Sequence, residues 1–230
     1  MAAPLRQPEL SDSARAALEP IVALLASERS APSSVRDPVS SWKVHVADSL
    51  SGLVFGELAS AESICDVGAG AGFPGLVLAA ALPDARVDLV ESNGRKCGFI
   101  ARAAGVGGLD NARAVNARAE AWATGDGAEA YDAVTARAVG RLSTLAELAS
   151  PLLREGGVLV AWKGRRNAGE EAELERAADE LAMAPAEVRP AGPYAGSEHR
   201  HLHLVRKLGP TPAGLPRRAG MAKKRPRGAR

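Results

Sequence analysis

The sequence predicts an α/β fold in which a parallel, doubly wound sheet is covered by helices on both faces. From residue 63 onward, short apolar runs alternate with amphipathic runs, and a glycine-rich turn joins the first run of each kind. With 230 residues, of which 46% are hydrophobic and 24% charged, the chain suits one globular domain or one domain with a small appendage.

Two helices are expected before the sheet. Apolar residues recur every three to four positions over residues 10–25, which places them on one face of a helix. Residues 33–38 form an expected loop, and helical spacing resumes over residues 39–58. We therefore expect residues 1–60 to form an N-terminal helical extension.

The central domain is expected to span residues 61–208. Short apolar runs predict strands at 63–67, 86–91, 112–116, 131–136 and 158–162, followed by two final strands at 186–189 and 201–206 that are candidates for an antiparallel pair. The fifth strand follows a turn at Gly156-Gly157. Helices are expected between the strands at 74–82, where Pro74 suits the first turn, and at 93–104, 118–122, 142–153 and 169–183.

Composition excludes several classes of protein. No run approaches the roughly 18 apolar residues of a membrane-spanning helix, and residues 1–7 lack the pattern of a signal peptide. We therefore expect a cytoplasmic protein. The two cysteines, Cys65 and Cys97, form no C-x-x-C pair, which argues against a disulfide framework, a zinc ribbon and a thioredoxin-type site. Both are expected to be buried thiols.

Charge is distributed unevenly along the chain. The formal net charge is +2, but residues 209–230 hold seven basic residues and no acidic one, which leaves −5 on residues 1–208. Because proline and glycine interrupt it, this basic segment is expected to be a flexible tail that cannot pack. Its expected partner is nucleic acid or the ribosome, and a solubilising terminus is the alternative. The candidate RNA-binding residues are Arg217, Arg218, Lys223, Lys224 and Arg225.

A glycine-rich loop follows the first expected strand. Residues 66–75 read D-V-G-A-G-A-G-F-P-G, and such small residues let a ligand approach the backbone at the start of a helix. Residues 70–75 also satisfy the dinucleotide pattern G-x-G-x-x-G, and Glu91 follows at the distance of a ribose-binding carboxylate. The pattern alone is weak, because glycines also serve tight packing of helix on strand.

The surroundings of the loop favour S-adenosylmethionine over NAD. Asp66 precedes Gly68 by two residues, which gives D-x-G-x-G-x-G, a loop suited to a nucleoside with an amino-acid tail. We also expect the 230 residues to leave no room for a separate substrate domain. Residues 117–120 follow the third strand, where they would meet an adenine ring.

Several motifs together resemble a known family. They are residues 66–75, L-V-E-S at 89–92, R-A-E at 118–120, V-T-A-R-A-V at 134–139, P-L-L-R-E-G-G at 151–157, K-G at 163–164, R-D-P at 36–38, W-x-x-H-x-x-D-S at 42–49, R-H-L at 200–202 and R-R-A-G at 217–220. Taken together in their order along the chain, these motifs resemble the bacterial small-subunit rRNA methyltransferase G family, also called glucose-inhibited division protein B. The resemblance covers nearly the whole chain. One departure is P-S-S at 32–34, where family members usually read N-L-T.

The resemblance implies a Rossmann-like class I S-adenosylmethionine-dependent methyltransferase, with a seven-stranded, mostly parallel sheet. It implies methylation of guanine N7 in 16S rRNA, either as naked rRNA or in the small ribosomal subunit. We expect a monomer that needs no metal ion. The cofactor positions carry over to Gly68, Phe73, Ala119, Glu120 and Arg137, with Glu91 as the expected ribose acceptor and Asp66 and Gly70 lining the loop.

Guanine N7 already offers a lone pair, so no proton needs to leave before the methyl group is transferred. The Asn-Pro-Pro-Tyr-type motif that handles exocyclic amines is missing after the fourth strand, where residues 135–137 read T-A-R. Positioning is therefore expected to dominate catalysis. Arg137 is the candidate catalytic positioning residue, holding either the methionine carboxylate or the guanine O6; a surface ion pair is the alternative.

The remaining chemistry-bearing side chains are weaker candidates. His199, His201 and His203 alternate along an expected strand, but no second ligand cluster accompanies them, so we expect no metal site and interpret His201 as structural or RNA-facing. His45 and Asp48 lie one helical turn apart, which leaves a local hydrogen bond, a cap and a substrate contact open. The three tryptophans are expected in the core.

Two alternative functions stay open. One is methylation of another RNA or of a small molecule, and the other is a non-catalytic RNA-binding or ribosome assembly factor with the same fold. Under the main hypothesis, removal of residues 210–230 should lower RNA affinity and leave cofactor affinity unchanged.

Overall fold

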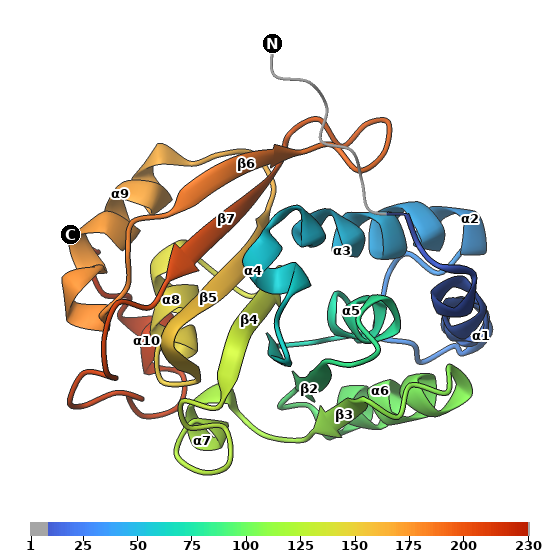
Figure 1. Cartoon of the computed structure of the whole chain (residues 1–230), viewed down its shortest axis with the longest axis horizontal. Helices are drawn as coiled ribbons and strands as arrows, with labels where there is room; N and C mark the ends of the chain where they lie inside the picture. The colour runs from blue at the N-terminus through green and yellow to red at the C-terminus, as the bar shows by residue number, and fades with distance from the viewer. Residues whose placement is uncertain (1–8, 230) are drawn as a thin grey trace.

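A seven-stranded sheet runs through the centre of the protein (Figure 1). The structure, a computed structural model, describes residues 9–229, so the expectation about a signal peptide at residues 1–7 lies outside the described residues. The strand order is β3-β2-β1-β4-β5-β7-β6, and β7 runs antiparallel to both of its neighbours. The predicted mostly parallel sheet is confirmed. Its strands are β1 (Ser63–Val67), β2 (Arg86–Val90), β3 (Ala112–Val115), β4 (Tyr131–Arg137), β5 (Leu153–Lys163), β6 (Glu187–Ala191) and β7 (Arg200–Arg206).

Helices cover both faces of the sheet, as predicted (Figure 1). One layer holds α1 (Asp12–Ser27), α5 (Gly75–Ala81) and α6 (Gly94–Val106). The other holds α7 (Ala119–Trp122), α8 (Leu142–Ala149), α9 (Ala168–Ala177) with the 3-10 turn η3 (Asp179–Leu181), and α10 (Met221–Lys224). Within residues 9–229, no helix has the length and apolar character needed to cross a membrane.

Each face of the sheet packs against its own hydrophobic cluster. Successive residues of a strand point to opposite faces, so Ile64 joins the cluster under α1, α5 and α6, while Cys65 joins the one under α8 and α9. A strand buried on both sides must be apolar at nearly every position, which explains the continuous apolar runs. Cys65 and Cys97 are both buried free thiols, as predicted.

The N-terminal extension contains one helix of the predicted kind and one that is interrupted. Ser11 caps α1, because its Oγ accepts a hydrogen bond from the backbone N of Ala14 at 3.2 Å. The single helix predicted over residues 39–58 is wrong in detail. The segment forms α2 (Pro38–Ser41), a π-helical turn η1 (Trp42–Ala47), α3 (Asp48–Leu50), a 3-10 turn η2 (Ser51–Val54) and, after the extended residue Phe55, α4 (Gly56–Ala59).

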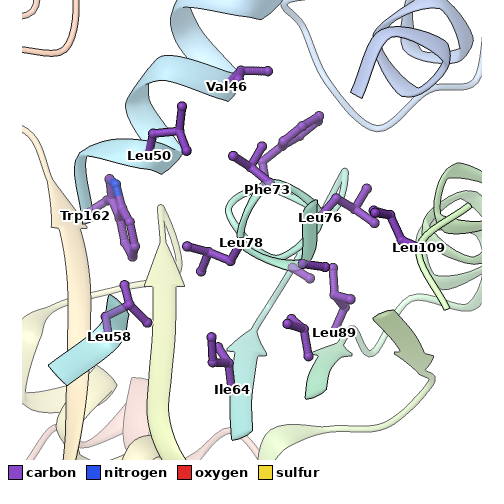
Figure 2. Packing of buried hydrophobic residues seen from close by; sticks show 14 of the residues in the cluster. Val46, Leu50, Leu58, Ile64, Phe73, Leu76, Leu78, Leu89, Leu109 and Trp162 are labelled. Atoms are coloured by element: carbon purple, nitrogen blue, oxygen red, sulfur yellow. The ribbon is translucent and has the colours of Figure 1, made fainter. Parts of the chain in front are cut away.

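Packing on β5 accounts for this irregular backbone. The indole Nε1 of Trp162 donates to the carbonyl of Asp48 at 2.7 Å, and a Cβ at Gly52 would lie 2.3 Å from the indole ring. Figure 2 shows Trp162 enclosed between Leu50 and Leu58. Trp162 is therefore core, as predicted, whereas the other two tryptophans are half-buried.

β5 begins earlier than predicted. Leu153 already pairs with Tyr131, and the register shifts before Ala133 pairs with Val158. The predicted turn at Gly156-Gly157 is instead an irregularity inside β5, with Gly156 at φ +80°. The helix predicted over residues 142–153 consequently ends at Ala149.

The prediction that the basic segment of residues 209–230 cannot pack is wrong. Ala222 is buried against α8, and its carbonyl accepts a hydrogen bond from Oγ1 of Thr144. Further along, the carbonyl of Gly228 accepts from Nε of Arg176 on α9 at 2.9 Å. Composition alone missed this packing because the contacts are made by backbone carbonyls, a small side chain and arginines that pair with glutamates on α8 and η3.

Candidate functional site

The glycine loop lies where the strand order reverses. β1 ends at Val67 between β2 and β4, and in open α/β sheets the crevice for ligands lies beyond such strand ends. The loop backbone has positive φ at Gly68 (+68°), Gly70 (+62°) and Gly72 (+93°). At Gly68 a Cβ atom would also lie 2.8 Å from Cγ2 of Val139. Both the positive φ angle and the close approach of Val139 therefore favour glycine at this position.

Asp66 stabilises this loop from beneath. Its Oδ2 accepts a hydrogen bond from the backbone N of Gly75 at 3.0 Å, and its Oδ1 accepts from Oγ1 of Thr135 at 3.0 Å. The side chain is buried, and burial raises the pKa of this carboxyl to about 7 despite both hydrogen bonds. Asp66 therefore ties the end of the loop to β4 and does not present a free carboxylate to a ligand.

Glu91 lies after β2 and holds the other part of the loop. Its Oε2 accepts from the backbone N of Gly70 at 3.0 Å, and its Oε1 accepts from the backbone N of Asn93 at 2.8 Å. Each carboxylate oxygen can accept a second hydrogen bond, so a ribose hydroxyl still has acceptors here. The contact to ribose stays a prediction.

A cavity of about 210 Å³ opens beside Gly68. Ala119 and Glu120, both predicted cofactor residues, form part of its wall at the start of α7. The wall combines the ends of β1 and β2, the start of α7, one side of α8 and part of the C-terminal segment, namely Val67, Gly68, Val90, Ser92, Arg118, Ala119, Glu120, Val139, Thr144, Leu148, Gly220, Ala222 and Lys223.

Arg137 ends β4 and is held by the N-terminal extension. Its Nη1 donates to Oδ2 of Asp48 at 3.0 Å and to the carbonyl of Val44 at 3.1 Å, and its Nη2 donates to Nδ1 of His45 at 3.2 Å. The next residue, Ala138, has φ +60°, an unusual conformation for a residue with a Cβ and one that is common at functional sites. The surface ion pair considered for Arg137 is thus a largely buried one.

His45 and Asp48, whose role the sequence left open, both hold Arg137 in place. Instead of bonding each other, both contact Arg137, and Asp48 also pairs with Arg200 at 3.3 Å. The His45 ring stacks on Phe73 of the glycine loop, with centroids 4.7 Å apart. The sequence indicated only that His45 and Asp48 share a helix face. It did not indicate Arg137 as their partner, because Arg137 lies at a strand end about 90 residues away in the chain.

The hydrogen bonds of His45 fix its protonation state. Arginine can only donate, so Nδ1 of His45 accepts from Arg137, and its Nε2–H faces the carbonyl of Val35 at 3.1 Å. Burial, together with the positive charge of Arg137, lowers the pKa of His45 to about 4. The ring is therefore neutral at physiological pH and orients Arg137 without repelling it.

Asp66 makes stability depend on pH. Its pKa is about 7 in the folded protein and lies near 3.8 when unfolded, so its favourable contribution is fully present below pH 3.8 and is lost as the pH rises through 7. Asp66→Asn keeps an acceptor for Gly75 and removes the charge. We expect this variant to gain more than about 1 kcal/mol over the wild type between pH 5 and pH 8.

Urea unfolding of both proteins at the two pH values measures this difference. His45 acts with the opposite sign, because its lowered pKa gives stability that is present above pH 6.5 and lost as the pH falls through 4. The wild type alone therefore does not isolate either group. An Asp66→Asn difference that stays constant with pH would contradict a raised pKa.

The structure separates the candidate RNA-binding residues into two groups. Arg217 makes a bidentate ion pair with Glu147, in which Nε and Nη2 each lie 2.5 Å from a carboxylate oxygen. These donors are therefore used inside the protein. The other four, Arg218, Lys223, Lys224 and Arg225, are exposed.

The three histidines do not converge. His203 is buried and contacts Oε1 of Glu171 at 3.2 Å, while Nδ1 of His201 lies 3.2 Å from the carbonyl of Gly164. In the part of the chain that the structure describes, no group of three or more His, Cys, Asp and Glu side chains is arranged to hold a metal ion.

The residues around the loop fit a nucleoside with an amino-acid tail. The cavity beside Gly68 is lined by apolar side chains such as Val90 and Leu148 and by polar ones such as Ser92 and Glu120, which together suit a flat base and a sugar. At about 210 Å³ it is smaller than the roughly 300 Å³ of a typical small-molecule pocket, so the rest of such a ligand would extend past Gly70 toward Phe73 and Arg137.

Comparisons with known proteins agree with this arrangement. The profile of a family described as "GidB: rRNA small subunit methyltransferase G" matches residues 24–201. A protein of Rubrobacter xylanophilus named "Ribosomal RNA small subunit methyltransferase G" is 42% identical over 91% of this chain and 82% of its own. A Staphylococcus saprophyticus protein of the same name is 38% identical over 79% of this chain and 76% of its own.

Among solved structures, the precorrin-6y C5,15-methyltransferase of Geobacter metallireducens is similar with a TM-score of 0.52 at 16% identity, over 70% of this chain and 88% of that one. At this identity the likeness concerns the fold alone. The fold is that of class I S-adenosylmethionine-dependent methyltransferases, as the sequence predicts.

Proposed function

This chain belongs to the rRNA small subunit methyltransferase G family, and we propose that it transfers the methyl group of S-adenosylmethionine to N7 of a guanine in 16S rRNA. One observation carries most of the proposal. The glycine loop at the strand reversal lies between the nucleoside-sized cavity and an anchored arginine, Arg137. We place the reaction in the bacterial cytoplasm.

The chain's own residues would hold the cofactor. When bound, S-adenosylmethionine supplies an activated methyl group on its sulfonium. Glu91 would accept hydrogen bonds from the ribose, and Ala119 and Glu120 would contact the adenine. Because Gly68 and Gly70 have no side chain, the cofactor could approach their backbone closely.

The site needs no general base, because guanine N7 carries a free lone pair. What it must supply is orientation of the two reactants. Arg137 has five N–H donors, of which three bind Val44, Asp48 and His45. The two that remain, Nε–H and one hydrogen on Nη2, would bind the methionine carboxylate or the guanine O6.

Exposed cations beside the cavity would bind RNA. Lys223 lines the cavity, and Arg218, Lys224 and Arg225 are exposed on the same C-terminal segment. Phosphate contacts of this kind give affinity that falls steeply with salt. Arg217, which is paired with Glu147, is left out of this set.

Isothermal titration calorimetry tests the cofactor. We expect the protein to bind S-adenosylhomocysteine and not NAD, because the cavity beside Gly68 has the size of one nucleoside and NAD contains two. Tighter binding of NAD would overturn the assignment.

Mapping of methylated guanines tests the substrate. Purified 16S rRNA and intact small subunits, each from cells lacking this protein, are incubated with enzyme and S-adenosylmethionine. We expect a new N7-methylguanine in one or both substrates. Cofactor binding without methyl transfer to either would favour the assembly factor, and transfer to another RNA would favour the other enzymatic alternative.

A further inference from the structure

The C-terminal segment of residues 217–228 supplies one wall of the cavity beside Gly68. Gly220, Ala222 and Lys223 line that cavity opposite residues of the glycine loop, although about 150 residues of chain separate the two. The segment is thus part of the same site as Ala119 and Glu120.

Specific contacts hold this wall in place. The backbone N of Gly220 donates to Oε1 of Glu120 at 2.7 Å, so the wall is bonded directly to a predicted cofactor residue. Behind it, Arg217 makes two hydrogen bonds to Glu147, which is 2% exposed, and also donates to the carbonyl of Arg225 at 2.8 Å. Arg227 pairs with Glu180 farther along.

The two sides of the segment differ in chemistry. Gly220, the buried Ala222 and Lys223 line the cavity, whereas Arg218, Lys224 and Arg225 are exposed and do not line it. Small residues suit close contact with a base, and exposed cations suit contact with phosphates.

We infer that residues 217–228 are a cofactor-binding element, which closes the nucleoside end of the cavity and presents its cations to RNA. The inference rests on the proposed function and reverses one expectation from the sequence. Loss of the segment lowers cofactor affinity as well as RNA affinity, because the cavity loses a wall.

A substitution inside the cavity tests this inference without deleting the segment. Ala222 is 3% exposed and lines the cavity, so Ala222→Leu places a larger side chain at the cavity wall. Calorimetry with S-adenosylhomocysteine should show a dissociation constant at least about tenfold higher than that of the wild type. Ala213→Leu is the matched control, since Ala213 is exposed, lies just before the segment and does not line the cavity. Its affinity should equal that of the wild type.

Limited trypsin digestion gives a second measurement on the wild type. Trypsin cuts after lysine and arginine except before proline, so the segment offers exposed sites at Arg218, Lys223 and Lys224, whereas Arg225 precedes Pro226 and is not cut. S-adenosylhomocysteine should slow cleavage there severalfold and leave cleavage at the exposed Arg165 unchanged. Mass spectrometry of the fragments identifies each site.

The outcomes separate the two proposals. If the wild type binds no S-adenosylhomocysteine, the proposed function fails and this inference fails with it. If the wild type binds, while Ala222→Leu binds equally well and cleavage is unprotected, only the inference is overturned. An Ala222→Leu protein with a collapsed melting temperature shifts the decision to the digestion result, which needs no variant.

Discussion

Methyl transfer should fall about tenfold or more when Arg137 is replaced by alanine, because one charged positioning contact is worth roughly 1.5 to 3 kcal/mol. The structure adds a cost that the sequence does not predict. Asp48 is buried and would keep only Arg200 as a cationic partner, so the variant should also lose about 3 kcal/mol or more of folding stability.

Single-turnover methylation of the small ribosomal subunit, with thermal melting alongside, separates these effects. Arg137→Lys is the control, since lysine keeps the charge beside Asp48 but loses the forked geometry. It should retain most of the stability and still transfer methyl groups slowly. Normal transfer by Arg137→Ala at a temperature where it is folded would remove Arg137 from the site.

The same variants identify the ligand of Arg137. If the two free N–H groups of Arg137 bind the methionine carboxylate, Arg137→Lys weakens binding of S-adenosylhomocysteine. If they bind guanine O6, that affinity is unchanged and only transfer slows. Calorimetry on the folded variant distinguishes the two.

Cofactor affinity should fall by about 1 to 3 kcal/mol when Glu91 is replaced by alanine, the cost of losing a charged hydrogen-bond acceptor. In dissociation constant this is roughly fivefold to 150-fold. The structure adds a reason to the lost contact with the cofactor, because Glu91 also accepts hydrogen bonds from the backbone N of Gly70 and of Asn93. Its loss would loosen the loop that approaches the cofactor.

Glu91→Gln distinguishes a direct contact from support of the loop. The glutamine amide has one oxygen, which can accept from only one of the two positions, while its NH₂ group faces the other backbone N–H. Calorimetry should rank the affinities as wild type, then Gln, then Ala. Glu62→Ala is a matched control on an exposed carboxylate before β1 and should bind normally. Wild-type affinity in Glu91→Ala would show that Glu91 does not contact the cofactor.

Local patterns were sufficient for most of the sheet. β1, β2 and β3 match their predictions within one residue at each end, because each is a short, mainly apolar run that lies between helical or turn signals. The boundaries failed where local signals had two meanings. Gly156-Gly157 reads as a turn, yet Leu153 already pairs with Tyr131, so the glycines lie inside a strand.

The sequence by itself determined the alternating fold, the glycine loop and the acids Asp66 and Glu91 beside it, because strand, turn and helix signals are local. Only the tertiary structure decided what those acids do, since each accepts hydrogen bonds from backbone groups of the loop itself. The same holds for the pairing of Arg137 with Asp48 and for the packing of the basic segment on α8 and α9. These contacts join residues far apart in the chain, and in the buried Arg137–Asp48 pair the low dielectric strengthens the attraction between the charges, which no spacing in the sequence records.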